Sequence, residues 1–279
     1  MNHKFSQSAF TLLEVIFVII ILGIVASIGS ELIVKVYQQY IVQRAQHRAS
    51  IKTELAATQI ANRLASAIPG TVFRRSALTG GTIENINDAM SDTTGNSYIA
   101  LQWVGADTES FNTNSIPSWS GFCDINISNE NTIITPGSNL SLINTIRTNF
   151  GYTNKFAIYF PYDNTPYYGD VSTNTSISLD NNTSHIVEHY KLAQTSYALV
   201  VEANVRGGKD LYLYYHFIPT PAPHIDIPSA GPKSLLLANI STFRFKGAGR
   251  TIRFKICKEE QISENINENI TSCKEKAVF

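Results

Sequence analysis

The longest apolar run of the chain lies near its start. From Phe10 to Ser30 almost every residue is apolar, and about twenty such residues are enough for one helix to cross a bilayer. The charged residue within this run is Glu14, close to its beginning. An ionised carboxylate in hydrocarbon lacks both water and a partner, so a simple anchor has no use for it. The pattern therefore predicts a membrane-spanning helix in which Glu14 serves a further purpose.

The helical pattern extends well beyond the apolar run. No proline follows until Pro69, and Pro69-Gly70 is a stop signal. A helix from Phe10 to Ala67 would be about 87 Å long at 1.5 Å per residue, so part of it must project from a compact domain. Two apolar stripes follow the membrane run. The first, which Arg44 and Arg48 interrupt, contains Ile33, Tyr37, Tyr40, Ile41, Ile51 and Leu55, and the second contains Ala57, Ile60, Ala61, Leu64 and Ile68. We predict that the second stripe packs on the protein's own sheet and that the first stays free, although the spacing also permits both stripes to pack against one domain.

Strand patterns dominate the second half of the chain. The segment from Thr71 to Asn154 is loop-rich, with a strand expected at 98–104 and a short helix at 140–148. Five further strands are expected, separated by clusters of Gly, Pro and Asn. They span 155–160, 195–203, 210–217, 241–246 and 250–257. The proline-rich segment from Pro219 to Pro232 is expected to be a surface connection. The predicted fold class is α+β, with a long N-terminal transmembrane helix packed at its C-terminal half on an antiparallel β-sheet domain.

The residues around the start of the apolar run form a specific motif. Ala9 is a small residue, Phe10-Thr11-Leu12-Leu13-Glu14 follows it, and an apolar helix continues the motif. This stretch resembles the prepilin N-terminus of type IV pilins and type II secretion pseudopilins. Two features depart from the family: Ala9 stands where Gly is usual, and the proline common near the end of the run is absent. The alternative interpretation is a secretory signal peptide that tolerates Glu14.

The resemblance implies processing, assembly and location. A prepilin peptidase would cleave after Ala9, the new amine of Phe10 would be methylated, and Glu14 would pair with the N-terminal amine of an adjacent subunit. The implied organisation is a leader at 1–9, a transmembrane and assembly helix at 10–30, a periplasmic part of that helix at 31–68, and a periplasmic β-rich domain at 71–279. Lys4 in the leader fits a cytoplasmic N-terminus in the bacterial inner membrane. The implied partners are other pilin or pseudopilin subunits, the peptidase, the inner-membrane assembly platform and membrane lipid.

The size of the domain narrows the expected role. It is larger than that of most major subunits in the family, so we expect a minor pilin or pseudopilin, a structural protein without enzymatic activity or cofactor. The segment from Leu235 to Phe245 also resembles a strand that recurs in minor pilins and minor pseudopilins. The formal net charge is zero, so no global field steers the chain to nucleic acid.

The chain has three cysteines, and a periplasmic domain permits a disulfide. Cys257 ends the last expected strand, and a polar excursion follows before Cys273. We predict that Cys257 and Cys273 are bonded, much as the C-terminal loop of many pilins is closed. Cys123 is then expected to be reduced and buried.

A hairpin near the C-terminus alternates apolar and basic residues. Phe243, Phe245, Ile252, Phe254 and Ile256 alternate with Arg244, Lys246, Arg253 and Lys255, and Arg250 lies at the turn. One function for the basic face would be to hold an anionic partner such as DNA, whose phosphates bind cations without sequence preference. The alternative is a solvated face neutralised by Glu259, Glu260, Glu264 and Glu268. The second function considered is therefore a DNA- or surface-binding subunit.

The segment from His185 to His189 spells the H-x-x-E-H pattern of a group of zinc peptidases. That chemistry needs both histidines on one helical face, but the neighbouring residues predict a turn leading into a strand. Residues four apart in a strand lie more than about 10 Å from each other. We therefore predict an exposed polar strand and no metal site, and a membrane-anchored periplasmic metalloenzyme is the third function considered.

Overall fold

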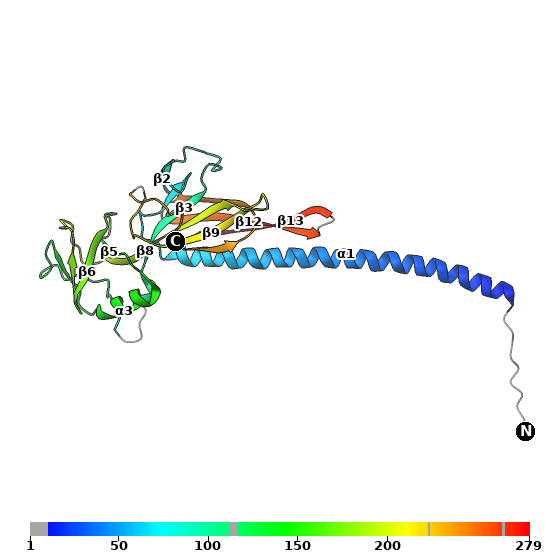
Figure 1. The fold of residues 1–279 in the computed structure, drawn as a ribbon, viewed down its shortest axis with the longest axis horizontal. Helices are drawn as coiled ribbons and strands as arrows, with labels where there is room; N and C mark the ends of the chain where they lie inside the picture. The colour runs from blue at the N-terminus through cyan, green and yellow to red at the C-terminus, as the bar shows by residue number, and fades with distance from the viewer. Residues whose placement is uncertain (1–10, 112–115, 223, 264–265) are drawn as a thin grey trace, which may run out of the picture. The chain divides into compact units, whose positions relative to one another are not determined.

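The computed structural model describes residues 11–111, 116–222, 224–263 and 266–279. It has an α+β fold: a long N-terminal helix followed by an antiparallel β-sheet domain (Figure 1). Helix α1 spans Leu12–Ala65, a length of 54 residues. It ends three residues before the expected limit at Ile68, because the chain there joins the sheet instead. The N–H of Ile68 donates to the Val104 carbonyl at 2.9 Å, and Ala67 forms a bridge with Gly105.

The other elements are short helices and strands. The helices are α2 (Thr108–Phe111) and α3 (Ser141–Phe150). The strands are β1 (Phe73–Arg75), β2 (Ile83–Asn85), β3 (Ala100–Ala106), β4 (Thr132–Ile134), β5 (Phe156–Tyr159), β6 (Tyr167–Thr173), β7 (Ser176–Leu179), β8 (Lys191–Ala203), β9 (Lys209–Phe217), β10 (Lys233–Leu237), β11 (Ile240–Ala248), β12 (Thr251–Ser263) and β13 (Ile266–Val278). All the expected strands exist within four residues of their predicted limits, except that β12 continues six residues beyond the predicted end at Cys257, and the expected helix at 140–148 is α3.

Among the described residues, the strands form two sheets. Ten strands make the larger sheet, in the order β2-β1-β3-β8-β5-β6-β7-β4, with β9 also on β8 and β10 on β9. Strand β8 is shared: residues 191–193 pair with β5, and residues 196–203 pair with β9. The smaller sheet contains β11, β12 and β13. The polar excursion expected before Cys273 is therefore wrong as a loop, because much of it continues β12 or begins β13.

The C-terminal part of α1 packs on the protein's own sheets. Ala57, Ile60 and Leu64 are buried in one core cluster with Trp103 of β3, and this cluster also contains Leu199, Leu211, Phe254 and Ile256. On another face of the same stretch, Ile51 and Leu55 are exposed, as are Ile33, Tyr37 and Tyr40 earlier in the helix. The structure thus confirms that the second stripe is the buried one. The alternative, in which both stripes pack against one domain, does not hold.

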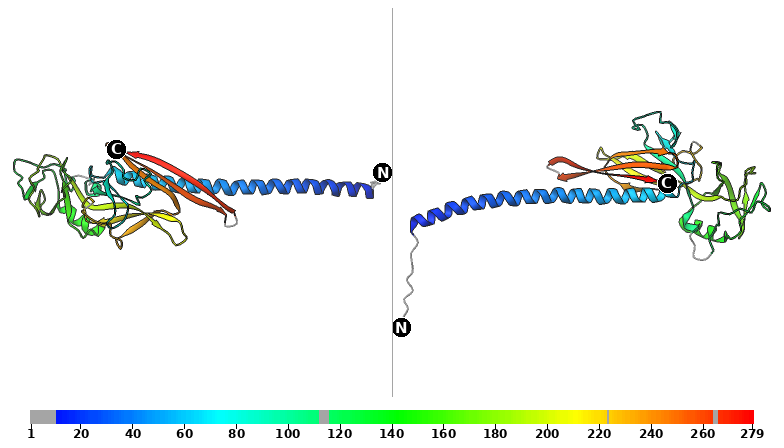
Figure 2. Two further views of the ribbon diagram at one scale, coloured as in Figure 1. Left: turned by 90° about the horizontal axis from the view of Figure 1, so that it is seen from above. Right: turned by 180° about the vertical axis from the view of Figure 1, so that it is seen from behind.

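Charged contacts also hold strand β13 to the helix. Lys274 and Lys276 both reach Glu54 of α1, and the shorter of the two ion pairs is 2.7 Å. Lys276 also donates to the Thr58 hydroxyl at 2.9 Å. Figure 2 shows the β12–β13 hairpin beside α1 where these pairs form.

The middle of the chain folds into a lobe with a core of its own. Between β3 and β8, the buried residues form a separate cluster: Trp119, Cys123, Ile133, Leu140, Ile143, Phe156, Ile158, Phe160, Tyr167, Ile177, Leu179, Tyr190 and Leu192. Buried hydroxyls link this lobe internally, since Thr135 Oγ1 lies 2.7 Å from both the Tyr190 hydroxyl and Ser138 Oγ. Strands β4, β6 and β7 in this region were not predicted. They are short and rich in Ser and Thr, so each contributes few of the apolar residues that a local pattern could reveal.

The proline-rich connection is more buried than predicted. Ala222 and Ile227 are fully buried, and Ile227 packs against Ala100, Ala198 and Val200 of the larger sheet. The buried guanidinium of Arg75 donates to the Ile225 carbonyl at 2.9 Å. The segment lacks regular secondary structure, but it covers part of the sheet instead of lying only on the surface.

Candidate functional site: the N-terminal motif and the basic hairpin

The N-terminal motif gives α1 its first turn. The Glu14 N–H lies 3.1 Å from the Thr11 carbonyl and 3.4 Å from Thr11 Oγ1. A threonine followed three residues later by glutamate is the capping-box pattern, which satisfies N–H groups that a helix start leaves without partners. Glu14 also lies in the first turn, where the helix dipole favours a carboxylate. Ala9 and Phe10, the residues of the predicted processing site, lie outside the described residues.

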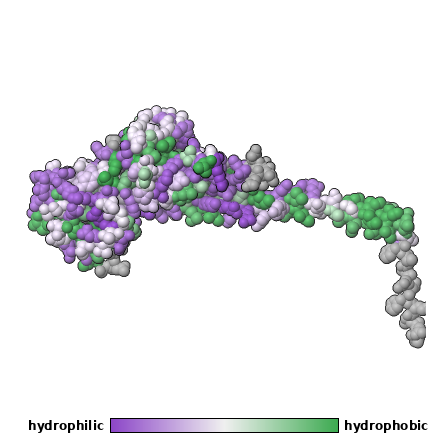
Figure 3. Space-filling view, in the orientation of Figure 1, coloured by the Kyte–Doolittle hydropathy of each residue, from purple (hydrophilic) through white to green (hydrophobic). Residues whose placement is uncertain are grey.

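The apolar segment that follows is uncovered. The large apolar side chains from Leu12 to Ile28 are 46% to 80% exposed. Figure 3 shows the resulting continuous hydrophobic surface at the N-terminal end of α1. Of the helices described, α1 is long and apolar enough to cross a membrane. So large an exposed apolar surface requires lipid or another protein to cover it.

The hairpin of β11 and β12 places four cations on one face. Arg244 is opposite Lys255, and Lys246 is opposite Arg253. On the other face, the alternating residues Phe243, Phe245, Phe254 and Ile256 are buried in the core beneath α1. Arg250 does not join the four cations. It lies at the turn and lines two other cavities, together with Lys191.

Three of the four cations have no partner within the described part of the chain. Lys246, Arg253 and Lys255 are exposed and form neither an ion pair nor a side-chain hydrogen bond there. Of the acidic residues expected to neutralise them, Glu260 lies 3.9 Å from Arg48 of α1. Glu264 and the Glu268 side chain lie outside the described residues. The acidic residue that lines the same cavity as these cations is Glu275 of β13.

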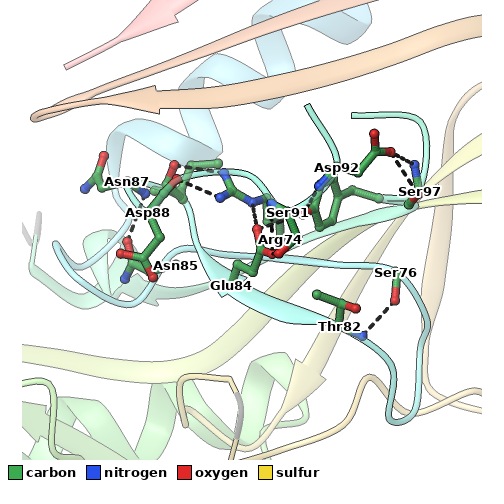
Figure 4. Close-up of polar contacts among 12 residues, drawn as sticks. Arg74, Ser76, Thr82, Glu84, Asn85, Asn87, Asp88, Ser91, Asp92 and Ser97 are labelled. Carbon is green, nitrogen blue, oxygen red and sulfur yellow. Dashed lines mark hydrogen bonds and ion pairs between the residues drawn. The ribbon is translucent and has the colours of Figure 1, made fainter. Parts of the chain in front are cut away.

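The loop at residues 90–98 faces this basic surface. Its base is a buried ion pair between β1 and β2, where Arg74 is 1% exposed and its Nε lies 2.6 Å from Glu84 Oε2 (Figure 4). Arg74 Nη2 also donates to the Asp88 carbonyl at 2.7 Å, and the Tyr98 hydroxyl donates to Glu84 at 2.7 Å. Burial raises the pKa of Glu84, but hydrogen bonds from Ser91, Tyr98 and Arg74 outweigh it and hold that pKa at about 2. The loop is therefore tied to the sheet at both ends.

A second carboxylate orders the tip of the loop. Asp92 accepts hydrogen bonds from the N–H groups of Thr94 at 2.9 Å and Ser97 at 2.8 Å. The Thr94 hydroxyl and the Ser97 groups hold the pKa of Asp92 well below its usual range. The Thr94 carbonyl then accepts a hydrogen bond from Arg244 Nη1 at 2.7 Å, and Asn96 Oδ1 accepts one from Arg244 Nη2.

The loop and the hairpin enclose a cavity of about 330 Å³. Its lining includes Thr93, Thr94, Tyr98, Lys246, Arg253 and Lys255. The sequence identified the cations but missed the loop that covers them. The available signal was the spacing of Asp92, Thr94 and Ser97, which is typical of side chains that bond to backbone N–H groups in turns.

The cysteines pair as predicted. Cys257 and Cys273 form a disulfide between the neighbouring strands β12 and β13. Cys123 is free and buried in the lobe, with its Sγ 3.4 Å from Ser128 Oγ. Burial raises the pKa of the Cys123 thiol.

The histidine segment does not form the predicted strand. Residues 185–188 are irregular, and His189 forms a single β-bridge with Phe122. The rings of these two residues meet edge-on, with their centroids 5.3 Å apart. His185, Glu188 and His189 are all exposed, as predicted for the polar side chains. Within the described residues, no three metal-binding side chains group together.

Comparison with known proteins identifies the N-terminal segment. Residues 4–30 match the family model described as the prokaryotic N-terminal methylation motif. No curated protein and no solved structure matched the chain. Residues 4–30 are thus similar to the N-terminal segment of type IV pilins and pseudopilins, and the uncovered apolar part of α1 continues that segment.

Proposed function

We propose that this protein is a minor structural subunit of a type IV pilus or type II secretion filament, anchored in the inner membrane before assembly. The observation that carries the proposal is the uncovered apolar surface of α1 with Glu14 in its first turn. In the membrane, lipid would cover this surface. In a filament, the same surface of neighbouring subunits would replace the lipid.

Processing supplies the partner for Glu14. Cleavage between Ala9 and Phe10 would create an ammonium group four residues before the carboxylate. Inside an apolar helical bundle, each of these charges alone would be desolvated at a cost of several kcal/mol. Pairing across subunits offsets that cost when the subunits are in register, so the charge pair specifies alignment. The intact mass of the mature chain should correspond to a methylated start at Phe10, whereas a start near Ser30 would indicate an ordinary signal peptide.

The test of this proposal is Glu14→Leu. The variant should be inserted, processed and folded as the wild type is, because Glu14 is exposed and belongs to none of the core clusters. Its amount in sheared filaments, measured by immunoblot, should fall at least about tenfold, since the ammonium group of Phe10 would be buried without a partner.

A second glutamate on the same helix provides the matched control. Glu31 is exposed and already pairs with Lys35 at 2.7 Å within the chain. Glu31→Leu should therefore enter filaments at close to the wild-type amount. Normal incorporation of Glu14→Leu would remove the argument that this residue specifies assembly.

The minor role rests on the size of the domain, which carries an additional lobe between β3 and β8. A subunit of this size is suited to a few copies per filament, and the presence of Glu14 favours a position below the tip, where a preceding neighbour is available. Quantitative mass spectrometry of purified filaments should find far fewer copies of this chain than of the main subunit. We propose no catalytic role, since proteins with this motif are generally structural.

A second candidate function is favoured by a specific observation. The β11–β12 hairpin gathers Arg244, Lys246, Arg253 and Lys255 on one face, and three of these cations have no partner in the described residues. Such a face suits a subunit that also binds an anionic partner, for which DNA is the candidate from the sequence.

A further inference from the structure

We infer that the cavity between the loop at residues 90–98 and the β11–β12 hairpin binds a phosphate or sulfate ester carried on a sugar. This inference rests on the second candidate function, the binding of an anionic partner, and it does not depend on the role in a filament. It specifies the partner as a compact oxyanion on a hydroxylated ligand, in place of a nucleic acid.

The arrangement of charge is the first argument. Arg244 is directly opposite Lys255, and Lys246 is directly opposite Arg253, so both cross-strand pairs are like-charged. Like charges at directly opposed positions destabilise a sheet. Because the hairpin's stability alone would favour other residues there, the cluster is explained best by a ligand that neutralises it.

The loop holds Arg244 in place before any ligand binds. Arg244 is held by two acceptors of the loop, the Thr94 carbonyl and the Asn96 side chain. The loop is itself fixed by Asp92 at its tip and by the Arg74–Glu84 pair at its base. A charged group that is already immobilised loses little conformational entropy when a ligand binds.

The third argument is the shape of the site. At about 330 Å³, the cavity lies at the lower end of the range for small-molecule pockets. Sites for single-stranded nucleic acid instead combine an extended basic track with several stacking aromatic rings, and sites for duplex DNA contact many phosphates along the helix. Here the next cation along the hairpin, Arg250, lines other cavities at the turn. The geometry therefore suits one compact anionic group.

The other side chains that line the cavity indicate which groups the rest of the ligand carries. Thr93 supplies a hydroxyl that forms no hydrogen bond in the described residues, and Glu275 supplies a carboxylate on the same cavity. A carboxylate repels an oxyanion but accepts hydrogen bonds from sugar hydroxyls. Asp92 is another carboxylate in the loop, but its oxygens already accept hydrogen bonds from the hydroxyls of Thr94 and Ser97. The three free cations thus face the ester group, and Glu275 faces the sugar.

The experiment uses the full chain in non-ionic detergent, with binding measured by isothermal titration calorimetry. The probes are glucose 6-phosphate, glucose 6-sulfate, inorganic phosphate, glucose and a duplex DNA of about 20 base pairs. The pocket variant is Arg253→Gln with Lys255→Gln. The control variant is Arg206→Gln with Lys209→Gln, which removes the same charge from exposed positions in the turn after β8 and at the start of β9.

We expect at least one sugar ester to bind the wild type, and the pocket variant to bind it about tenfold more weakly or worse, because two charge-assisted contacts are lost. The control variant should bind as the wild type does, and glucose alone should not bind. Without ligand, the pocket variant should melt about 1–3 °C higher than the wild type, since like-charge repulsion is relieved. This rise also verifies that the variant is folded.

Three results would overturn the inference. Equal weakening in both variants would show that binding follows net charge alone. Tighter binding of duplex DNA than of either ester, lost in the pocket variant, would assign the cations to nucleic acid. No binding of either ester by the wild type would leave the cluster without this ligand. Because none of these measurements involves filaments, none of them tests the assembly role of Glu14.

Discussion

Two stretches of the same helix behave in opposite ways. Between Leu12 and Ile28, every large apolar side chain is at least 46% exposed. In residues 49–65, Ile60 is 1% and Leu64 3% exposed. The first stretch is apolar all round, as expected for a helix surrounded by lipid or by other helices, and the second has one apolar stripe facing its own sheet. The period of the apolar positions, and not their number, therefore indicates what covers a helix.

The second stretch has one buried side and one exposed side. Ile51 and Leu55 lie on it but remain 46% and 59% exposed, away from the buried stripe. They continue the stripe of Ile33, Tyr37 and Tyr40 from the preceding part of the helix. Within residues 49–65, the protein's own domain therefore covers one side of α1 and leaves Ile51 and Leu55 exposed.

The largest expected effect tests this contrast directly. Ile60→Ala should destabilise the domain by about 2–5 kcal/mol, because it leaves a cavity in the main core. Leu55→Ala, on the same helix, should change the stability by less than about 0.5 kcal/mol. Denaturant unfolding followed by the fluorescence of the two buried tryptophans, Trp103 and Trp119, would measure both. Similar values for the two variants would mean that the distinction between the two stripes is wrong.

The second-largest expected effect concerns β13, the strand whose lysines form ion pairs with Glu54 of α1. Replacing Cys257 and Cys273 by Ser should cost about 3 kcal/mol by the chain-entropy model, for a sequence separation of 16 residues. Strand β13, which carries the lysines paired with Glu54, should then exchange its amide hydrogens faster than α1 does around Ile60. Hydrogen exchange and denaturant unfolding check the two parts. An unchanged unfolding midpoint would show that the strands hold together without the bond.

The smallest effect is a pH dependence at the contact between β13 and the helix. The hydrogen bond from Lys276 lowers the pKa of Glu54 from its usual value of 4.5 more than burial raises it, and the hydrogen bond from Lys274 adds to the lowering. A pKa lowered by folding contributes stability that is present above about pH 4.5 and is lost as the pH falls through the folded-state value. Glu54→Gln should therefore lose slightly less stability than the wild type when the pH is lowered from 6 to 3. Thermal unfolding across this range is the measurement.

Glu84 provides the reference for that measurement. Its pKa of about 2 arises at a partly enclosed ion pair with Arg74, so its contribution should vanish between about pH 4.5 and pH 2. Glu84→Gln should flatten the acid dependence more than Glu54→Gln does. The reverse order would show that the exposed contact on α1 matters more than the buried pair.

Local patterns predicted much of this fold and part of the candidate site. The long helix, its buried stripe, the long strands β8 and β9 and the Cys257–Cys273 pairing all follow from regularities that persist over many residues. The segment from Leu235 to Phe245 shows where such reasoning fails. It resembled one continuous strand, but Asn239 adopts a left-handed φ of 55° and its N–H donates to Asp210 at 2.9 Å. The segment is therefore divided between β10 and β11 in two different sheets.

The long apolar helix, the methylation motif, the α+β class and the alternation of the basic hairpin could all be predicted from the sequence alone, because each depends on residues close together in the chain. The tertiary structure decided what lies opposite them. Scattered apolar residues form the core of the lobe between β3 and β8, and part of the proline-rich connection is buried. The loop around Asp92 lies over the cations of the hairpin, where Arg244 donates to the carbonyl of Thr94, 150 residues away in sequence. Such pairings depend on which surfaces can be buried together and which backbone groups then need partners. Those are properties of the whole packed chain, and no local window of sequence contains them.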